Sequence, residues 1–145
     1  KESLFGMIQT KIPNSKCLDL FAGSGALGLE AISMGAKSCC FVDHSKEAIK
    51  VIKQNIIKIE EECRVIDSDY KRFLKETKEK FDIIFLDPPY QNGLLNKALK
   101  IIEELDLLND EGIVVCEYEN ENPISSLKII KEKNYGTKNI KIFTK

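Results

Sequence analysis

Several features are scarce or absent in this chain of 145 residues, and each absence excludes a class of protein or makes it less favoured. No apolar run approaches the roughly 18 residues that a membrane-spanning helix needs, and no stretch resembles a signal peptide. Glycine and proline contents are ordinary, which argues against collagen-like and low-complexity chains. The formal net charge of −1 argues against a strongly basic nucleic-acid binder. With only two arginines, the chain has little of the planar fork that reads bases, so we expect any nucleic acid to be held electrostatically by lysines.

Cysteine and histidine give no sign of a metal site. The five cysteines are odd in number, no C-x-x-C spacing occurs, and the chain has one histidine. Neither a disulfide framework nor a zinc site is therefore favoured. We expect free, buried thiols and a cytoplasmic location. The cysteines are Cys17, Cys39, Cys40, Cys63 and Cys116.

Short apolar runs alternate with helical patterns, and the length suits one domain over residues 1–145. Strands are expected at Cys17–Phe21, Ser38–Val42, Cys63–Asp67, Phe81–Leu86, Ile113–Glu117, Leu127–Glu132 and Asn139–Thr144. Helices are expected at Lys1–Ile12, Ala26–Met34, Ser45–Ile59, Asp69–Lys78 and Leu95–Leu105, and turns at Asn109–Gly112 and Asn134–Gly136. This alternation predicts an α/β fold of three layers, with a mostly parallel seven-stranded sheet that ends in an antiparallel hairpin.

A glycine-rich turn follows the first expected strand. Gly23, Gly25 and Gly28 fit G-x-G-x-x-G at the start of a helix, where backbone N–H groups approach a ligand. Asp43 ends the second strand, where an acid would bind ribose hydroxyls. A nicotinamide dinucleotide and S-adenosylmethionine both fit this pattern. Asp19 favours the second, because a carboxylate there would bind a cationic amino group; a buried Asp satisfied by backbone N–H groups is the alternative.

Other polar residues follow the next strands. Asp69 comes after the third strand, where it would meet an adenine amino group, and Tyr70 would line that pocket or pack in the core. His44 adjoins Asp43, and we expect it to line the pocket or lie on the surface. Lysines and an arginine could contact nucleic-acid phosphates, with a solvated surface as the alternative. They are Lys71, Arg72, Lys75, Lys78, Lys128, Lys131, Lys133, Lys138 and Lys141.

The tetrapeptide Asp87-Pro88-Pro89-Tyr90 directly follows the buried fourth strand, where open α/β sheets place their ligands. The prolines stiffen the turn and lack N–H groups. Asp87 and a neighbouring carbonyl therefore form a fork that accepts two N–H bonds from a planar amine. Tyr90 offers a face on which a base can stack.

These motifs resemble a known family. LDLFAGSGALGLEAISMGA (Leu18–Ala36), FVD (Phe41–Asp43) and FDIIFLDPPYQNGLLNKAL (Phe81–Leu99) are similar to class I S-adenosylmethionine-dependent methyltransferases, and most to the RsmD-type family, which methylates a guanine N2 amine in 16S ribosomal RNA.

The resemblance implies a Rossmann-like fold, S-adenosylmethionine as cofactor, no metal, and 16S rRNA or the assembling small subunit as partner of a monomer. It implies a catalytic set of Asp87, Pro88, Pro89 and Tyr90. The implied cofactor-binding set is Asp19, Phe21, Ala22, Gly23, Gly25, Asp43, His44, Asp69, Tyr70 and Asp87.

Two departures from the family are expected. The basic segment that normally precedes the residues matching Lys1–Phe5 is absent, and no helix is evident between the fifth and sixth strands. Three alternatives stay open: an amino-methyltransferase for DNA adenine or protein glutamine, a nicotinamide-dependent oxidoreductase, and a non-catalytic nucleotide- or RNA-binding module. The oxidoreductase leaves Asp87–Tyr90 without a role.

Overall fold

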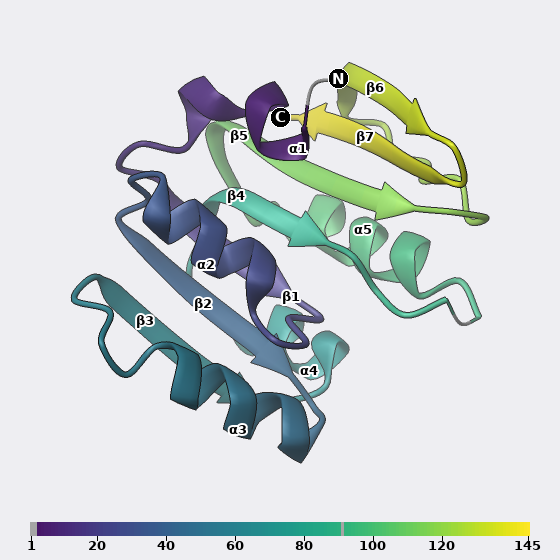
Figure 1. Ribbon diagram of the computed structural model, residues 1–145. Helices are drawn as coiled ribbons and strands as arrows, with labels where there is room; N and C mark the ends of the chain where they lie inside the picture. Colours follow the sequence, from purple (N-terminus) through teal and green to yellow (C-terminus); the bar gives the residue numbers. More distant parts are fainter. Residues whose placement is uncertain (1–2, 91) are drawn as a thin grey trace.

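A single sheet organises the chain, for which a computed structural model describes residues 3–90 and 92–145. Seven strands lie in the order β3-β2-β1-β4-β5-β7-β6. Their bounds are Lys16–Leu20 (β1), Ser38–Asp43 (β2), Glu62–Asp67 (β3), Phe81–Leu86 (β4), Leu108–Tyr118 (β5), Lys128–Tyr135 (β6) and Lys138–Thr144 (β7). Strands β1 to β5 pair in parallel, while β7 runs antiparallel to both β5 and β6. This confirms the predicted α/β fold and its terminal hairpin (Figure 1).

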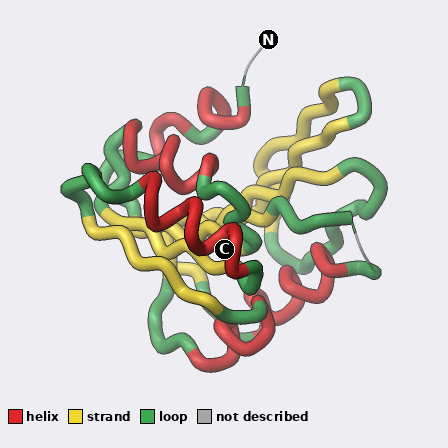
Figure 2. The backbone as a smooth tube through the Cα atoms, turned by 60° about the horizontal axis from the view of Figure 1, so that its bottom comes forward, coloured by secondary structure: helices red, strands yellow, loops and turns green. Residues whose placement is uncertain are grey.

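Helices cover both faces of the sheet and make the three predicted layers. The helices are Leu4–Met7 (α1), Ala26–Ser33 (α2), Lys46–Asn55 (α3), Tyr70–Glu76 (α4) and Leu94–Glu104 (α5), with a 3-10 turn at Gln9–Lys11. Figures 1 and 2 show α1, α2 and α3 on one face and α4 and α5 on the other. Two buried apolar clusters fill the layers on either side of the sheet.

Strand β4 shows why its sequence is almost continuously apolar. Ile83 and Phe85 belong to the cluster under α2, whereas Ile84 and Leu86 belong to the cluster under α5. All four side chains are fully buried. A parallel strand covered on both faces has no solvated side and so lacks the polar alternation of a half-exposed strand.

Five of the predicted elements or turns differ in the structure. The expected turn Asn109–Gly112 lies inside β5, where Glu111 has a φ of 63° and the pairing with β4 shifts register between Phe81 and Ile83. The hairpin turn lies after Tyr135, which pairs with Lys138. Helix α3 ends at Asn55, α4 covers only Tyr70–Glu76, and the amino-terminal segment has one helical turn and a 3-10 turn. Residues 1 and 2 of that segment lie outside the described residues.

The cysteines occupy strands, as predicted, and all are free. Cys63 is a partial correction, because it is only partly buried on β3, at the edge of the sheet, while the other four are buried. In the ranges 3–90 and 92–145, no helix is long and apolar enough to cross a membrane. The described loop between β5 and β6 contains no helix, as expected.

Helix α2 lies close to β2 because Gly28 has no side chain. A Cβ atom at this position would lie 2.5 Å from the Phe41 Cε2 atom and 2.6 Å from the Cys39 Sγ atom. Both neighbours are buried, so they have little room to move. The third glycine of the motif is therefore required by packing between helix and strand.

Replacing Gly28 with alanine should destabilise the fold. Alanine favours helix by about 1 kcal/mol, but the overpacking should outweigh that gain and lower the free energy of unfolding by about 1–3 kcal/mol. Urea titration measures it, with the exposed Glu30→Ala in the same helix as control. The double variant Gly28→Ala/Cys39→Ala should recover part of the loss. A Gly28→Ala protein as stable as the parent would contradict this packing argument.

Candidate active site

The main cavity, of about 650 Å³, opens at the carboxyl ends of β1 to β4. This is where ligands bind in open α/β sheets, and the volume suits a small-molecule cofactor. Its lining includes three acidic side chains and, among the described residues, no lysine or arginine. The lining residues are Phe21, Gly23, Val42, Asp43, His44, Ser45, Ala48, Ser68, Asp69, Tyr70, Asp87, Pro89 and Leu94.

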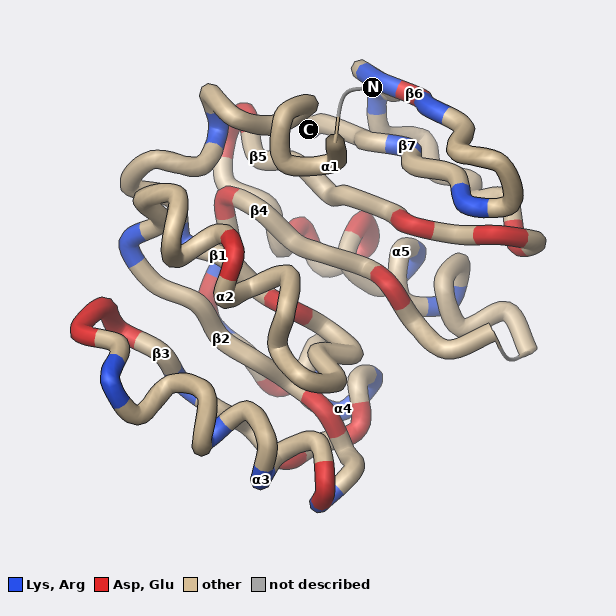
Figure 3. Tube along the Cα trace, viewed as in Figure 1, with Lys and Arg blue, Asp and Glu red and all other residues tan. Residues whose placement is uncertain are grey.

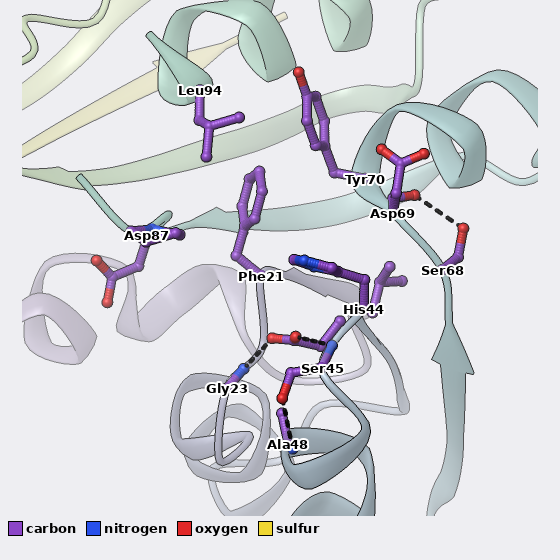
Figure 4. Close-up of a pocket in the computed structure, with 13 residues that line it drawn as sticks. Phe21, Gly23, His44, Ser45, Ala48, Ser68, Asp69, Tyr70, Asp87 and Leu94 are labelled. Carbon is purple, nitrogen blue, oxygen red and sulfur yellow. Dashed lines mark hydrogen bonds between the residues drawn. The ribbon is translucent and has the colours of Figure 1, made fainter. Parts of the chain in front are cut away.

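The glycine loop and Asp43 form the base of this cavity. The Gly23 N–H donates to Asp43 Oδ2 at 2.9 Å, and the Ser45 N–H donates to Oδ1 at 2.9 Å (Figure 4). Each carboxylate oxygen keeps a further lone pair for a hydroxyl donor. Gly23 has a φ of +60°, and the preceding Phe21 has a φ of 62°, a conformation that side-chain-bearing residues rarely adopt. The loop is thus shaped to turn sharply and present its backbone to the cavity.

Three rings surround the same space. The rings of Phe21 and Tyr70 are 5.2 Å apart between centroids, and His44 comes from the segment after β2. Figure 4 shows all three facing the cavity. Tyr70 also packs against the core beneath α5, so it does both of the things that the sequence suggested. Flat apolar rings of this kind suit the planar base of a nucleoside.

Asp69 has a different local partner from the one predicted. Its carboxylate caps α4, accepting from the N–H groups of Lys71 at 3.0 Å and Arg72 at 3.2 Å. This N-cap arrangement satisfies orphan donors at a helix start. Asp69 still lines the cavity, together with Ser68. A role for its carboxylate toward an amino group stays a prediction.

Three predicted cofactor residues lie behind the cavity wall. Ala22 donates its N–H to the Val42 carbonyl at 2.9 Å. Gly25 begins α2 with a φ of +86° and packs toward Phe41. Asp19 is 2% exposed, and its Oδ2 accepts the Gly28 N–H at 2.9 Å. None of the three is among the lining residues, so any role for them is exerted from behind the loop.

The environment of Asp19 favours its neutral form. Burial raises the pKa of this carboxyl from 3.8 to about 7, the Gly28 N–H opposes the rise, and Asp87 and Asp43 add to it. The cause is that a negative charge at this depth has little water and two negative neighbours. A cation bound at this edge would reverse that balance and favour the ionised form.

A second, smaller cavity of about 250 Å³ lies on the other side of the Asp87–Tyr90 segment. Asp87 and Pro89 line both cavities, so this segment forms the wall between them. Tyr90 is 74% exposed beside the second cavity, with its ring accessible. The other lining residues come mainly from the end of β5 and the loop that follows it. The full lining is Asp87, Pro88, Pro89, Tyr90, Leu95, Glu117, Tyr118, Glu119, Glu121 and Lys138.

Glu117 lines the second cavity but is not among the site residues predicted from the sequence. It lies near the carboxyl end of β5, beside Asp87, because the preceding residues Leu86 and Cys116 pair between β4 and β5. Burial raises the pKa of Glu117, Asp87 raises it further, and Lys138 opposes the rise. The sequence did contain a signal for Glu117. Asp43 and Asp87 were selected because each is an acidic residue where a parallel strand ends, and the same rule selects Glu117.

Two of the predicted phosphate-binding lysines serve the fold instead. Lys141 is 7% exposed, and its Nζ donates to Asn122 at 2.8 Å and lies 3.4 Å from Glu132. The Lys131 Nζ donates to the Met7 carbonyl at 2.7 Å and ties β6 to α1. The remaining basic residues stay candidates. Figure 3 shows acidic residues at the carboxyl ends of β2, β4 and β5 and basic ones along β6.

Comparison with known proteins agrees with this arrangement. The family model described as "Conserved hypothetical protein 95" matches residues 1–144. Ribosomal RNA small subunit methyltransferase D of Haemophilus influenzae is 32% identical, over 99% of this chain and 78% of that protein. The solved Escherichia coli protein yhhF is 30% identical, with a TM-score of 0.91, and the match covers 98% of this chain and 83% of that one.

The sheet order and the position of the cavity define a Rossmann-like fold of the class I methyltransferase type. Dinucleotide-binding sheets end in the order 5-6, whereas here an antiparallel β7 lies between β5 and β6. Within this class, the chain belongs to the RsmD-type family of methyltransferases. Among the described residues, no group of three or more acidic, cysteine or histidine side chains is placed to hold a metal ion.

Replacing Asp19 with asparagine should stabilise the protein at high pH. The folded state holds the Asp19 proton up to about pH 7, while the unfolded chain releases it near 3.8, so stability falls as pH rises between these values. Asparagine keeps an oxygen for Gly28 and cannot ionise. The variant should therefore gain on the order of a few kcal/mol over the parent at pH 8 and less than half as much at pH 5. Urea titrations at both pH values measure the gain, with the exposed Asp110→Asn as control. Equal gains in stability at both pH values would refute the raised pKa of Asp19.

Proposed function

We propose that this protein transfers a methyl group from S-adenosylmethionine to the exocyclic N2 amine of a guanine in small-subunit ribosomal RNA. The observation that carries the proposal is that Asp87 and Pro89 line two cavities at once. A methyl donor in the larger cavity and an amine in the smaller one would meet at this wall. The names of relatives such as the Haemophilus influenzae protein support ribosomal RNA as the acceptor.

The charge of the larger cavity supports the cofactor. A dinucleotide brings an anionic pyrophosphate, which basic side chains stabilise, whereas S-adenosylmethionine carries a sulfonium and an ammonium group. The lining supplies Asp43, Asp69 and Asp87 and, within the described chain, no basic side chain. Asp43 would hold the ribose hydroxyls, and the paired rings of Phe21 and Tyr70 would form an apolar surface beside the adenine. When bound, the cofactor supplies a methyl group on a positively charged sulfur.

The chain's own part in the reaction is mainly positioning. Asp87 accepts an N–H of the target amine, and the Pro88 carbonyl accepts the other. Both bonds draw the amine nitrogen away from the plane of the ring and free its lone pair, and Asp87 receives the released proton. Tyr90 stacks on the base, which has to leave its helix to enter the cavity. Alignment of this kind supplies roughly 7–11 kcal/mol in well-oriented reactions.

The decisive experiment is transfer of labelled methyl from S-adenosylmethionine to unmodified small ribosomal subunits, followed by nucleoside digestion. We expect label in N2-methylguanosine. Asp87→Ala should lower turnover by about 10²-fold or more while changing cofactor affinity, measured by calorimetry, far less. The exposed Asp110→Ala is the matched control.

DNA and a glutamine-containing peptide are tested in parallel. Label that appears there and not in the subunits would refute the acceptor. Binding of cofactor without transfer to any acceptor would refute the enzymatic function. Unchanged turnover in Asp87→Ala would refute the role of that residue.

A further inference from the structure

Three neighbouring strands bring three charged side chains to the second cavity. Asp87 follows β4, Glu117 lies at the end of β5, and Lys138 begins β7. In the sheet, β5 lies between β4 and β7, so Glu117 is the middle member of the row. The strand register agrees: Leu86 pairs with Cys116, which places Asp87 beside Glu117, and Glu117 pairs with Ile140, two residues from Lys138.

The row has a fixed chemical order. Carboxylates offer acceptors and an ammonium offers donors, so this row of three presents acceptor, acceptor and donor, while Glu119 and Glu121 lie on the loop after β5. The base-pairing edge of guanine presents the complementary sequence: the 2-amino group, the N1–H and the O6 carbonyl. Adenine and cytosine place an unprotonated ring nitrogen beside their amine, which would face the middle carboxylate lone pair to lone pair. A glutamine side chain would likewise place its carbonyl oxygen, an acceptor, opposite the middle carboxylate.

We propose that Glu117 accepts the N1–H of the guanine whose amine Asp87 holds, that Lys138 donates to its O6, and that this row selects guanine over other bases. The inference rests on the function proposed above and extends it to the choice of base. A buried acceptor left facing a lone pair is costly, which is how hydrogen-bonding sites reject analogues that lack a donor.

The free protein is compatible with this role. With no base bound, Asp87 and Glu117 are neighbours at the ends of β4 and β5, and burial together with the nearby Asp87 raises the pKa of Glu117. The two N–H groups of guanine would give each of these neighbouring carboxylates a donor of its own. Burying two neighbouring carboxyl groups costs desolvation free energy and adds little to the stability of the fold. Their position therefore favours a binding role over a structural one.

The test compares guanine with 2-aminopurine at the methylated position of the RNA. 2-Aminopurine keeps the 2-amino group but has an unprotonated N1 and no O6. The wild-type protein should prefer guanine by about 10²-fold or more in kcat/KM. In Glu117→Gln the amide N–H can donate to the bare N1, so the preference should fall at least about tenfold, with transfer to 2-aminopurine rising in absolute rate. The exposed Glu104→Gln carries the same charge change and should keep the wild-type preference.

Lys138→Met gives a second, independent variant. It should slow transfer to guanine and leave 2-aminopurine unaffected, because only guanine has an O6. Thermal unfolding verifies that each variant folds; were Glu117→Gln unfolded, the Lys138→Met pattern would decide.

Each outcome has one meaning. If wild type transfers no methyl to guanine RNA, the proposed function fails, and the inference with it. If wild type is active but Glu117→Gln slows both bases equally or changes neither, the selection by Glu117 is refuted while the function stands. A fall in preference confined to Glu117→Gln, and absent from Glu104→Gln, supports the inference.

Discussion

Burial of β1 and β4 on both faces is the constraint from which the rest of the structure follows. Leu18 and Leu20 on β1, and the apolar run Ile83–Leu86 on β4, are shielded from water by helices on either side. Polar groups in such strands are costly unless paired, and Asp19 is accommodated by the Gly28 N–H. Chemistry is therefore concentrated where the chain leaves the sheet. Because parallel strands all leave at the same edge, Asp43, Asp69, Asp87 and Glu117 come together there although they are far apart in sequence.

The fold was largely predictable for the same reason. Strand β4 has the predicted bounds, Phe81–Leu86, because a nearly continuous apolar run flanked by polar residues has few other solutions. Prediction failed where pairing between strands overrides local composition. The polar stretch at Asn109–Gly112 resembles a turn, yet Leu108 pairs with Phe81 and draws the stretch into β5. The hairpin turns after Tyr135, where Gly136 takes a φ of 61°.

The site was predictable in its strand-end positions and less so in its partners. Gly23, Asp43 and Asp87 line the main cavity, as the spacing of motifs and strands suggested. What sequence could not distinguish is whether an acid after a strand faces a ligand or caps the next helix. Asp43 is the last residue of β2, whereas Asp69 lies two residues after the end of β3 and binds the N–H groups of its own helix. Glu117 acquires its neighbours only through the β4–β5–β7 order, which no local pattern reveals.

The acidic lining of the main cavity bears on turnover as well as on binding. In the proposed reaction the sulfur carries a positive charge before transfer and none afterwards, while Asp43 and Asp69 in the lining take no part in the proton transfer. The electrostatic attraction therefore weakens in the same step that consumes the substrate. A cavity lined by carboxylates and, among the described residues, by no lysine or arginine therefore favours exchange of spent cofactor for fresh.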